Sequence, residues 1–139
     1  MKIELPDAAV VEKLLDAALE EDGFDLDVTS RISTPAAEPA AAAAPARFVL
    51  RARQAGTFAG CAVLDAIEKR FFGAIHVDSR LNDSEAFEAG QTLAMLEGYA
   101  GLILSIERTM LNFLQRLCGV ATLTRRYVDE TRGTPCRIY

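Results

Sequence analysis

GQTLAMLEGYAGLILSIERTMLNFLQRLCGVATLT, residues 90–124, carries the strongest structural signal in the chain. Gly90 precedes a segment, Gln91 to Glu97, that is typical of a strand. From Ile103 onward, apolar residues recur at steps of three and four, which places them on one face of a helix. That apolar face consists of Ile103, Ile106, Met110, Leu114 or Leu111, Leu117 and Ala121. The stretch therefore predicts a strand that leads into a helix.

Glycines mark the expected ends of this helical region. Gly119 predicts a break, because glycine inside a helix costs about 1 kcal/mol relative to alanine. We expect a second helix from about Val120 to Thr131, which stops before Gly133. Residues 136–139 are typical of the opening of a strand, and such a strand has no partner of its own in this sequence.

Helices and strands also alternate upstream of this stretch. The expected elements are an amphipathic helix over 6–20 with Pro6 in its first turn, a strand over 47–53, a turn or short strand over 56–60, a helix over 61–72 and a strand over 74–78. Asp27 or Thr29 is placed to cap a short turn. Three prolines interrupt the alanines of residues 35–46, which predicts a loop. The order of elements indicates an α+β fold class.

The two upstream helices and the first strand have predicted inward faces. The inward residues are Val11, Leu14, Leu15, Ala18 and Leu19 in the first helix, Phe48, Leu50 and Ala52 in the strand, and Val63, Leu64, Ile67, Phe71 and Phe72 in the second helix. Arginines alternate with the apolar residues of the strand, so the strand has one polar face.

Length and composition exclude several classes of protein. The chain has 139 residues and a net charge of −5, which fits one domain without the profile of a nucleic-acid binder. No apolar run reaches the roughly 18 residues of a membrane span, and the mixed N-terminus excludes a signal peptide. Cys61, Cys118 and Cys136 form no CxxC pair, so we expect neither a disulfide framework nor a zinc site, and a cytoplasmic location.

Charged residues offer two candidate binding sites. Arg108 lies beside Glu107 on the expected helix, with Asn112 one turn later, and its guanidinium matches a carboxylate with two parallel hydrogen bonds. The alternative is a chance pair of charges on a solvated surface. Asp22, Asp25 and Asp27 offer oxygen ligands to a cation, but their spacing does not match an EF-hand loop, and a solvated acidic loop is the simpler interpretation.

Two further reactive side chains are interpreted as structural. His76 is the only histidine, and it alternates with the apolar residues of a strand, which favours an exposed or structural role over catalysis. Cys118 lies among apolar residues of the helical region, so we interpret its side chain as a small buried hydrophobic group.

The stretch from Glu88 to Thr124 resembles the nicotinate-nucleotide pyrophosphorylase (carboxylating) family, also called quinolinate phosphoribosyltransferase. The family's run is close to E-R-T-x-L-N-x-L-x-x-x-S-G-I-A-T-x-T, and only Cys118 for serine and Val120 for isoleucine depart from it. Two weaker matches lie upstream. Glu21 to Thr29 is similar to the family's acidic E-D-x-G-x-G-D-[VI]-T loop, and Gly56 to Gly60 is similar to its d-G-v-l-A-G turn.

The resemblance implies a fold and an activity. It implies the N-terminal α/β sandwich-like domain of a type II phosphoribosyltransferase, over residues 1–105, and a helical entry to an open α/β barrel, over 106–139. It also implies dimers or higher oligomers in which this domain covers the partner's barrel. The reaction transfers a phosphoribosyl group from phosphoribosyl pyrophosphate to quinolinate with magnesium, giving nicotinate mononucleotide, pyrophosphate and carbon dioxide.

The resemblance also assigns roles to residues. Arg108 is expected to bind a quinolinate carboxylate in the partner's site, with Glu107, Thr109 and Asn112 in support. The sequence ends near the position of the family's D-T-R-K-T motif. The barrel and its catalytic and magnesium-binding groups are therefore expected to lie outside this chain. We therefore expect no catalytic residue and no metal ligand here, and an inactive chain when it is alone.

Two alternatives stay open at this point. A truncated, non-catalytic relative would bind a partner such as a full-length homologue. A paralogue from a molybdenum locus would share the fold and act on another substrate. With the barrel absent, the apolar face formed by Ile106, Met110, Leu114 and Leu117 is expected to be exposed, which predicts self-association.

Overall fold

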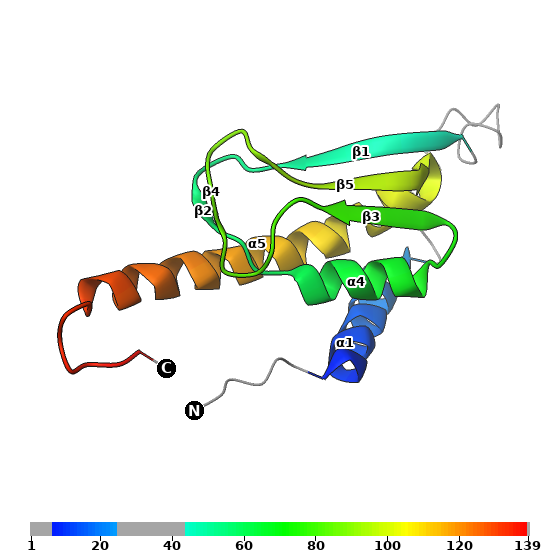
Figure 1. Ribbon diagram of the computed structural model, residues 1–139. Helices are drawn as coiled ribbons and strands as arrows, with labels where there is room; N and C mark the ends of the chain where they lie inside the picture. Colours follow the sequence, from blue (N-terminus) through cyan, green and yellow to red (C-terminus); the bar gives the residue numbers. More distant parts are fainter. Residues whose placement is uncertain (1–6, 25–43, 139) are drawn as a thin grey trace.

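The computed structural model describes residues 7–24 and 44–138, and it combines three helices with two antiparallel sheets (Figure 1). The elements are α1 (Ala8–Glu21), β1 (Pro45–Arg51), β2 (Gly56–Thr57), α4 (Cys61–Arg70), β3 (Ile75–Ser79), β4 (Ala86–Phe87), β5 (Thr92–Tyr99) and α5 (Ala100–Glu130). The predicted α+β fold class is confirmed.

The larger sheet has the strand order β1-β5-β3, with β5 in the centre and antiparallel to both neighbours. Helices α1, α4 and α5 lie on one side of it (Figure 1). In β1 the side chains alternate between exposed and half-buried, as the sequence predicts for a strand with one polar face. The second sheet contains only β2 and β4.

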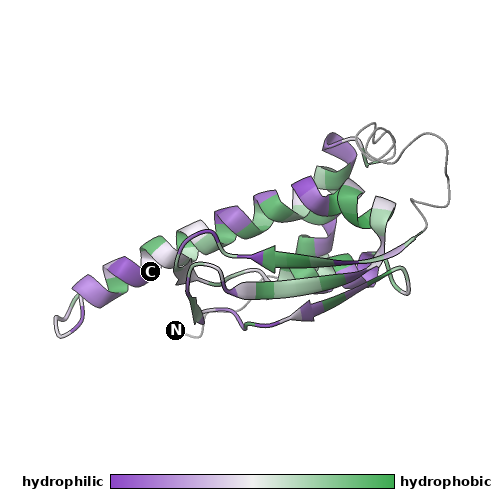
Figure 2. Cartoon of the chain, turned by 90° about the horizontal axis from the view of Figure 1, so that it is seen from above, coloured by the Kyte–Doolittle hydropathy of each residue, from purple (hydrophilic) through white to green (hydrophobic). Residues whose placement is uncertain are grey.

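The core lies between the larger sheet and the helices. Its most buried large side chains are Phe58, Leu64, Ile67, Leu96, Ile103 and Ile106. Along α5, hydrophobic and hydrophilic segments alternate (Figure 2). The apolar face predicted for this helix is buried at Ile103, Ile106, Met110 and Leu114. The predicted periodicity is therefore confirmed over the first half of α5.

Three local predictions were wrong. Leu14 and Phe72 were expected inside, but they are 55% and 90% exposed. Phe72 lies two residues beyond the end of α4, after the C-cap residue Phe71, so helical spacing no longer determines its direction. The loop predicted over 35–46 was wrong at Pro45 and Ala46, which belong to β1. Strand β4 was not predicted. Pro6, Asp27, Thr29 and residues 35–43 lie outside the described residues.

The break predicted at Gly119 was also wrong. Helix α5 continues from Ala100 to Glu130 and includes Gly119, so residues 120–131 form no separate helix. A penalty of about 1 kcal/mol is too small to interrupt a helix whose flanking turns keep their hydrogen bonds. Residues 136–138 form no strand, and Tyr139 lies outside the described residues. The expected boundary between residues 105 and 106 falls within α5, and the division into two domains stays a prediction.

We expect Gly119→Ala to stabilise the protein by about 0.5–1 kcal/mol, because alanine has the higher helix propensity. A Cβ at this position would meet no atom within 4 Å. The measurement is the free energy of unfolding from urea titration. Gly98→Ala is the control, and we expect it to lower the free energy of unfolding. A Cβ at this position would lie 2.3 Å from the carbonyl oxygen of Ala74. A loss of stability in Gly119→Ala would show that the helix does break.

The exposed apolar surface lies further along α5 than the sequence predicted. Ile106, Met110 and Leu114 pack into the protein's own core. The exposed apolar residues of the helix are Leu117, Val120, Leu123, Tyr127 and Val128. We call these five residues the distal apolar face.

Self-association stays a prediction, and the distal apolar face is its expected source. We expect sedimentation velocity to show a concentration-dependent increase in mass. Leu123→Lys is expected to weaken this association, because it places a charge on the apolar face. Phe72→Lys is the matched control, since Phe72 is also exposed but lies on the turn after α4. A monomer at every concentration would contradict the prediction.

Candidate functional site

The side chains of Glu107, Arg108 and Thr109 point in different directions from the first half of α5. Successive helical residues are rotated by about 100°, so neighbours in sequence separate in space. Glu107 and Asn112 are exposed, and the side chain of Arg108 is 80% exposed. Thr109 is buried at 2% exposure. The motif therefore presents an arginine to solvent and fixes the next residue inside the protein.

Asp22 connects this motif to the end of α1. It forms the C-cap of α1, where its backbone N–H donates to the carbonyl oxygen of Ala18. Its Oδ2 atom accepts a hydrogen bond of 2.5 Å from the Thr109 hydroxyl. Its Oδ1 atom lies 3.7 Å from Nε of Arg108. We call Asp22, Arg108 and Thr109 the arginine site.

Of the three carboxylates considered as a cation site in the acidic loop, only that of Asp22 is described by the structure. Asp22 faces Arg108 and Thr109, whereas Asp25 and Asp27 lie outside the described residues. Among the residues that the structure describes, no group of three or more His, Cys, Asp or Glu side chains is placed to hold a metal ion. Sequence reasoning missed the pairing of Asp22 with Thr109.

The chemistry of the arginine site fits an anion. The contact with Asp22 is on the Nε side of the guanidinium, and the structure gives the Nη atoms no partner among the described residues. A guanidinium with free Nη groups donates two parallel hydrogen bonds to a carboxylate or phosphate. An exposed ion pair of this length contributes little to stability, so Arg108 is not required for packing.

The segment from Gly56 to Gly60 docks onto α5 further along the helix than the motif, at Leu114, Cys118 and Thr122. The backbone N–H of Thr57 donates to Oγ1 of Thr122 over 2.8 Å, and that hydroxyl donates to the carbonyl oxygen of Cys118. A Cβ on Gly56 would lie 2.8 Å from Oγ1 of Thr122 and also from the Phe87 ring. A Cβ on Gly60, whose φ is +153°, would lie 2.3 Å from Leu114. Glycine at both positions therefore allows the close approach to α5.

Asp83 caps helix α4 from a distant loop. The N-cap residue, Gly60, has no side chain to fill that role. Oδ1 of Asp83 accepts hydrogen bonds from the backbone N–H groups of Gly60 and Cys61, at 2.7 and 3.0 Å. This carboxylate also benefits from the positive end of the helix dipole.

We expect Asp83→Ala to reduce the free energy of unfolding by about 1–2 kcal/mol, the usual cost of losing a helix cap. Thermal and urea denaturation measure the change. Asp65→Ala is the matched control, because Asp65 is exposed on the same helix and caps nothing. Equal stability of the two variants would contradict the capping role.

Within the described ranges, neither the cysteines nor the histidine has an arrangement suited to nucleophilic catalysis. Burial raises the pKa of the Cys118 thiol, and burial together with the nearby Asp83 raises the pKa of Cys61. Both thiols are therefore protonated at neutral pH and poor nucleophiles. His76 is exposed, as predicted, and its Nδ1 lies 2.6 Å from a carboxylate oxygen of Glu68.

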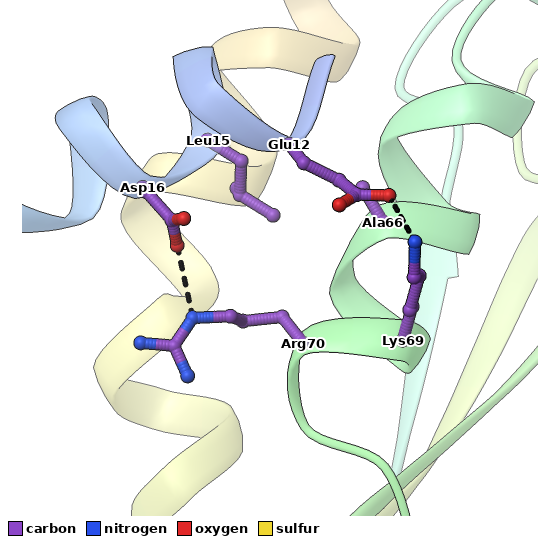
Figure 3. A pocket seen from close by; sticks show the side chains of 6 residues that line it. All are labelled: Glu12, Leu15, Asp16, Ala66, Lys69 and Arg70. Atoms are coloured by element: carbon purple, nitrogen blue, oxygen red, sulfur yellow. Dashed lines mark hydrogen bonds and ion pairs between the residues drawn. The ribbon is translucent and has the colours of Figure 1, made fainter. Parts of the chain in front are cut away.

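A pocket between α1 and α4 is lined by two ion pairs (Figure 3). Its volume is about 240 Å³. Lys69 contacts Glu12 at 2.6 Å, and Arg70 contacts Asp16 at 2.9 Å. Because each charged side chain in the pocket already has a partner of opposite charge, the pocket offers no free charged group to a ligand.

No helix in the described part of the chain is both long enough and apolar enough to cross a membrane. This includes α5, whose length of 31 residues would suffice but whose polar face would not.

Comparison with known proteins assigns the family. The family model described as "Quinolinate phosphoribosyl transferase, N-terminal domain" matches residues 27–118. A nicotinate-nucleotide pyrophosphorylase [carboxylating] of Mycobacterium leprae is 32% identical over 124 residues, which cover 87% of this chain and 42% of that protein. A quinolinate phosphoribosyltransferase [decarboxylating] of Nicotiana tabacum, named 2b, mitochondrial, is 32% identical over 133 residues, which cover 89% of this chain and 36% of that protein.

Solved structures agree with this assignment. The nicotinate-nucleotide pyrophosphorylase from Francisella tularensis superposes with a TM-score of 0.80 at 25% sequence identity, covering 93% of this chain and 44% of that one. The chain thus spans less than half of the length of these relatives. It belongs to the quinolinate phosphoribosyltransferase family, and it corresponds to the N-terminal portion of that family's proteins.

Proposed function

We propose that this chain forms the N-terminal part of an enzyme that makes nicotinate mononucleotide from quinolinate and phosphoribosyl pyrophosphate, for NAD synthesis. Pyrophosphate and carbon dioxide are the other products. Membership of the family supports this proposal, and so do the printed names of the relatives. The single observation that carries it for this chain is the exposed guanidinium of Arg108 in the arginine site.

Arg108 is proposed to bind a carboxylate of quinolinate. Quinolinate carries two carboxylates, and a guanidinium with free Nη groups is suited to one of them. In the proposed dimer, this domain covers the partner's barrel, and Arg108 reaches into the partner's site. Glu107 and Asn112 are exposed near Arg108 on α5, so they are available to contact the same ligand. Their supporting roles are part of the proposal.

The chemical steps are proposed to occur in the barrel half of the complete enzyme. Magnesium is proposed to bind there together with phosphoribosyl pyrophosphate. The contribution of this chain is to bind and orient quinolinate and to exclude water from the partner's site. A cytoplasmic location is likewise a proposal, since the Nicotiana tabacum relative is named as mitochondrial.

The test is a product assay on the complete protein isolated from its own cells. We expect nicotinate mononucleotide to form only when quinolinate and phosphoribosyl pyrophosphate are both present. Omission of either substrate, or replacement of quinolinate by nicotinate, is the control. The intact mass of the same preparation establishes that the barrel is present. A preparation that contains the barrel and forms no product would contradict the proposal.

A further inference from the structure

The ion pair between Arg108 and Asp22 is unusually long for two neighbouring charges. At 3.7 Å it is the longest ion pair among the described residues, where the others range from 2.5 to 3.4 Å. The Asp22 side chain is only 24% exposed, so water screens it less than the exposed pairs. A tight, two-bond contact would therefore be expected here, and the structure lacks it.

The hydrogen bond from Thr109 explains this length. Thr109 donates to Oδ2 of Asp22 over 2.5 Å, and Thr109 is almost completely buried on α5. The backbone of Asp22 is fixed as well, because its N–H closes the last turn of α1. One carboxylate oxygen is therefore held by the protein interior, and only the other faces Arg108.

We propose that Thr109 is a positioning residue that keeps the guanidinium of Arg108 available to an anionic ligand. Without the Thr109 hydroxyl, the Asp22 carboxylate could rotate and accept two hydrogen bonds from the guanidinium, as carboxylates commonly do. Asp22 would then compete with the ligand for Arg108. The identity of the ligand, quinolinate, rests on the proposed function.

Thr109→Val in the complete enzyme tests this competition. Valine keeps the shape of the side chain and removes only the hydroxyl. We expect the KM for quinolinate to rise about fivefold to tenfold, with kcat little changed, because the free energy of a partly exposed ion pair now opposes binding. Thr109→Ser keeps the hydroxyl, and its KM is expected to stay within about twofold of the wild-type value.

A second substitution separates positioning from a purely structural role. In Thr109→Val/Asp22→Asn the competing charge is absent, and we expect the KM to return toward the wild-type value. A structural role would leave the double variant no better than Thr109→Val. If Thr109→Val does not fold, Thr109→Ala replaces it in both variants, because alanine also removes the hydroxyl. A double variant whose KM stays as high as that of the single variant would overturn the proposal.

An NMR measurement on this chain makes the result independent of enzyme activity. The Nε–H signal of Arg108, identified by its loss in Arg108→Lys, reports how strongly the guanidinium is paired. We expect Thr109→Val to shift this signal downfield, and Thr109→Val/Asp22→Asn to reverse the shift. An unchanged signal in Thr109→Val would overturn the positioning role. Absence of product from the wild-type enzyme would instead contradict the proposed function alone.

Discussion

Arg108→Ala in the complete enzyme is expected to raise the KM for quinolinate by about 10- to 100-fold. A hydrogen bond to a charged group contributes about 1.5–3 kcal/mol, and each 1.4 kcal/mol corresponds to a factor of about ten in affinity. Stability should change little, because the Arg108 side chain is 80% exposed and its one ion pair with a described residue is 3.7 Å long. Steady-state kinetics with varied quinolinate and saturating phosphoribosyl pyrophosphate measure the effect.

Two matched variants make this result specific. Arg53→Ala removes another exposed arginine, on the turn after β1, and is expected to leave the KM unchanged. Arg108→Lys keeps the charge but not the planar pair of donors, so an intermediate KM is expected. The KM for phosphoribosyl pyrophosphate should stay constant throughout. Wild-type kinetics in the Arg108→Ala enzyme would contradict the proposed role of Arg108.

The sequence predicted the candidate arginine but not its surroundings. Helical spacing along residues 103–114 was enough to predict the buried apolar residues of α5, because α5 is regular there. The contact between Thr109 and Asp22 joins residues 87 positions apart. No local pattern reports such a pair, since it depends on where the end of α1 packs against α5.

The wrong predictions have physical causes of the same kind. Gly119 carries a local penalty, but helix formation is cooperative, and the hydrogen bonds on both sides outweigh it. Leu14 falls on the predicted face of α1, yet the packing of α1 against its neighbours leaves it exposed. Propensity describes one residue, whereas burial is decided by the elements around it.

The turn from Gly56 to Gly60 shows how a weak sequence signal acquires meaning from the fold. Its resemblance to the family turn was too short to stand alone. In the structure, the glycines allow α5 to approach closely, and Phe58 between them is completely buried. The backbone N–H of Phe58 donates to the carbonyl oxygen of Glu85, and its carbonyl oxygen accepts from the N–H of Ser84. Both backbone polar groups of Phe58 are thus held by residues 84 and 85.

Phe58→Ala is therefore expected to cost about 3–5 kcal/mol of the free energy of unfolding, the range for truncating a buried aromatic ring. The anchored backbone cannot move inward to fill the space, so the cost should lie toward the upper end of that range. Urea denaturation followed by circular dichroism measures it. Because a typical domain has about 5–15 kcal/mol of stability in total, partial unfolding at room temperature is a further expected sign.

Phe72→Ala is the matched control, because the same atoms are removed from a side chain that is 90% exposed. We expect a change within about 0.5 kcal/mol there, as for other surface substitutions. The sequence assigned Phe72 to the interior, so the pair of variants compares the fold directly with the prediction from helical spacing. Equal losses in the two variants would mean that both rings are buried in solution. A large loss of unfolding free energy in Phe58→Ala alone would show that the core lies beneath the turn from Gly56 to Gly60. The core there supports the helix that carries Arg108.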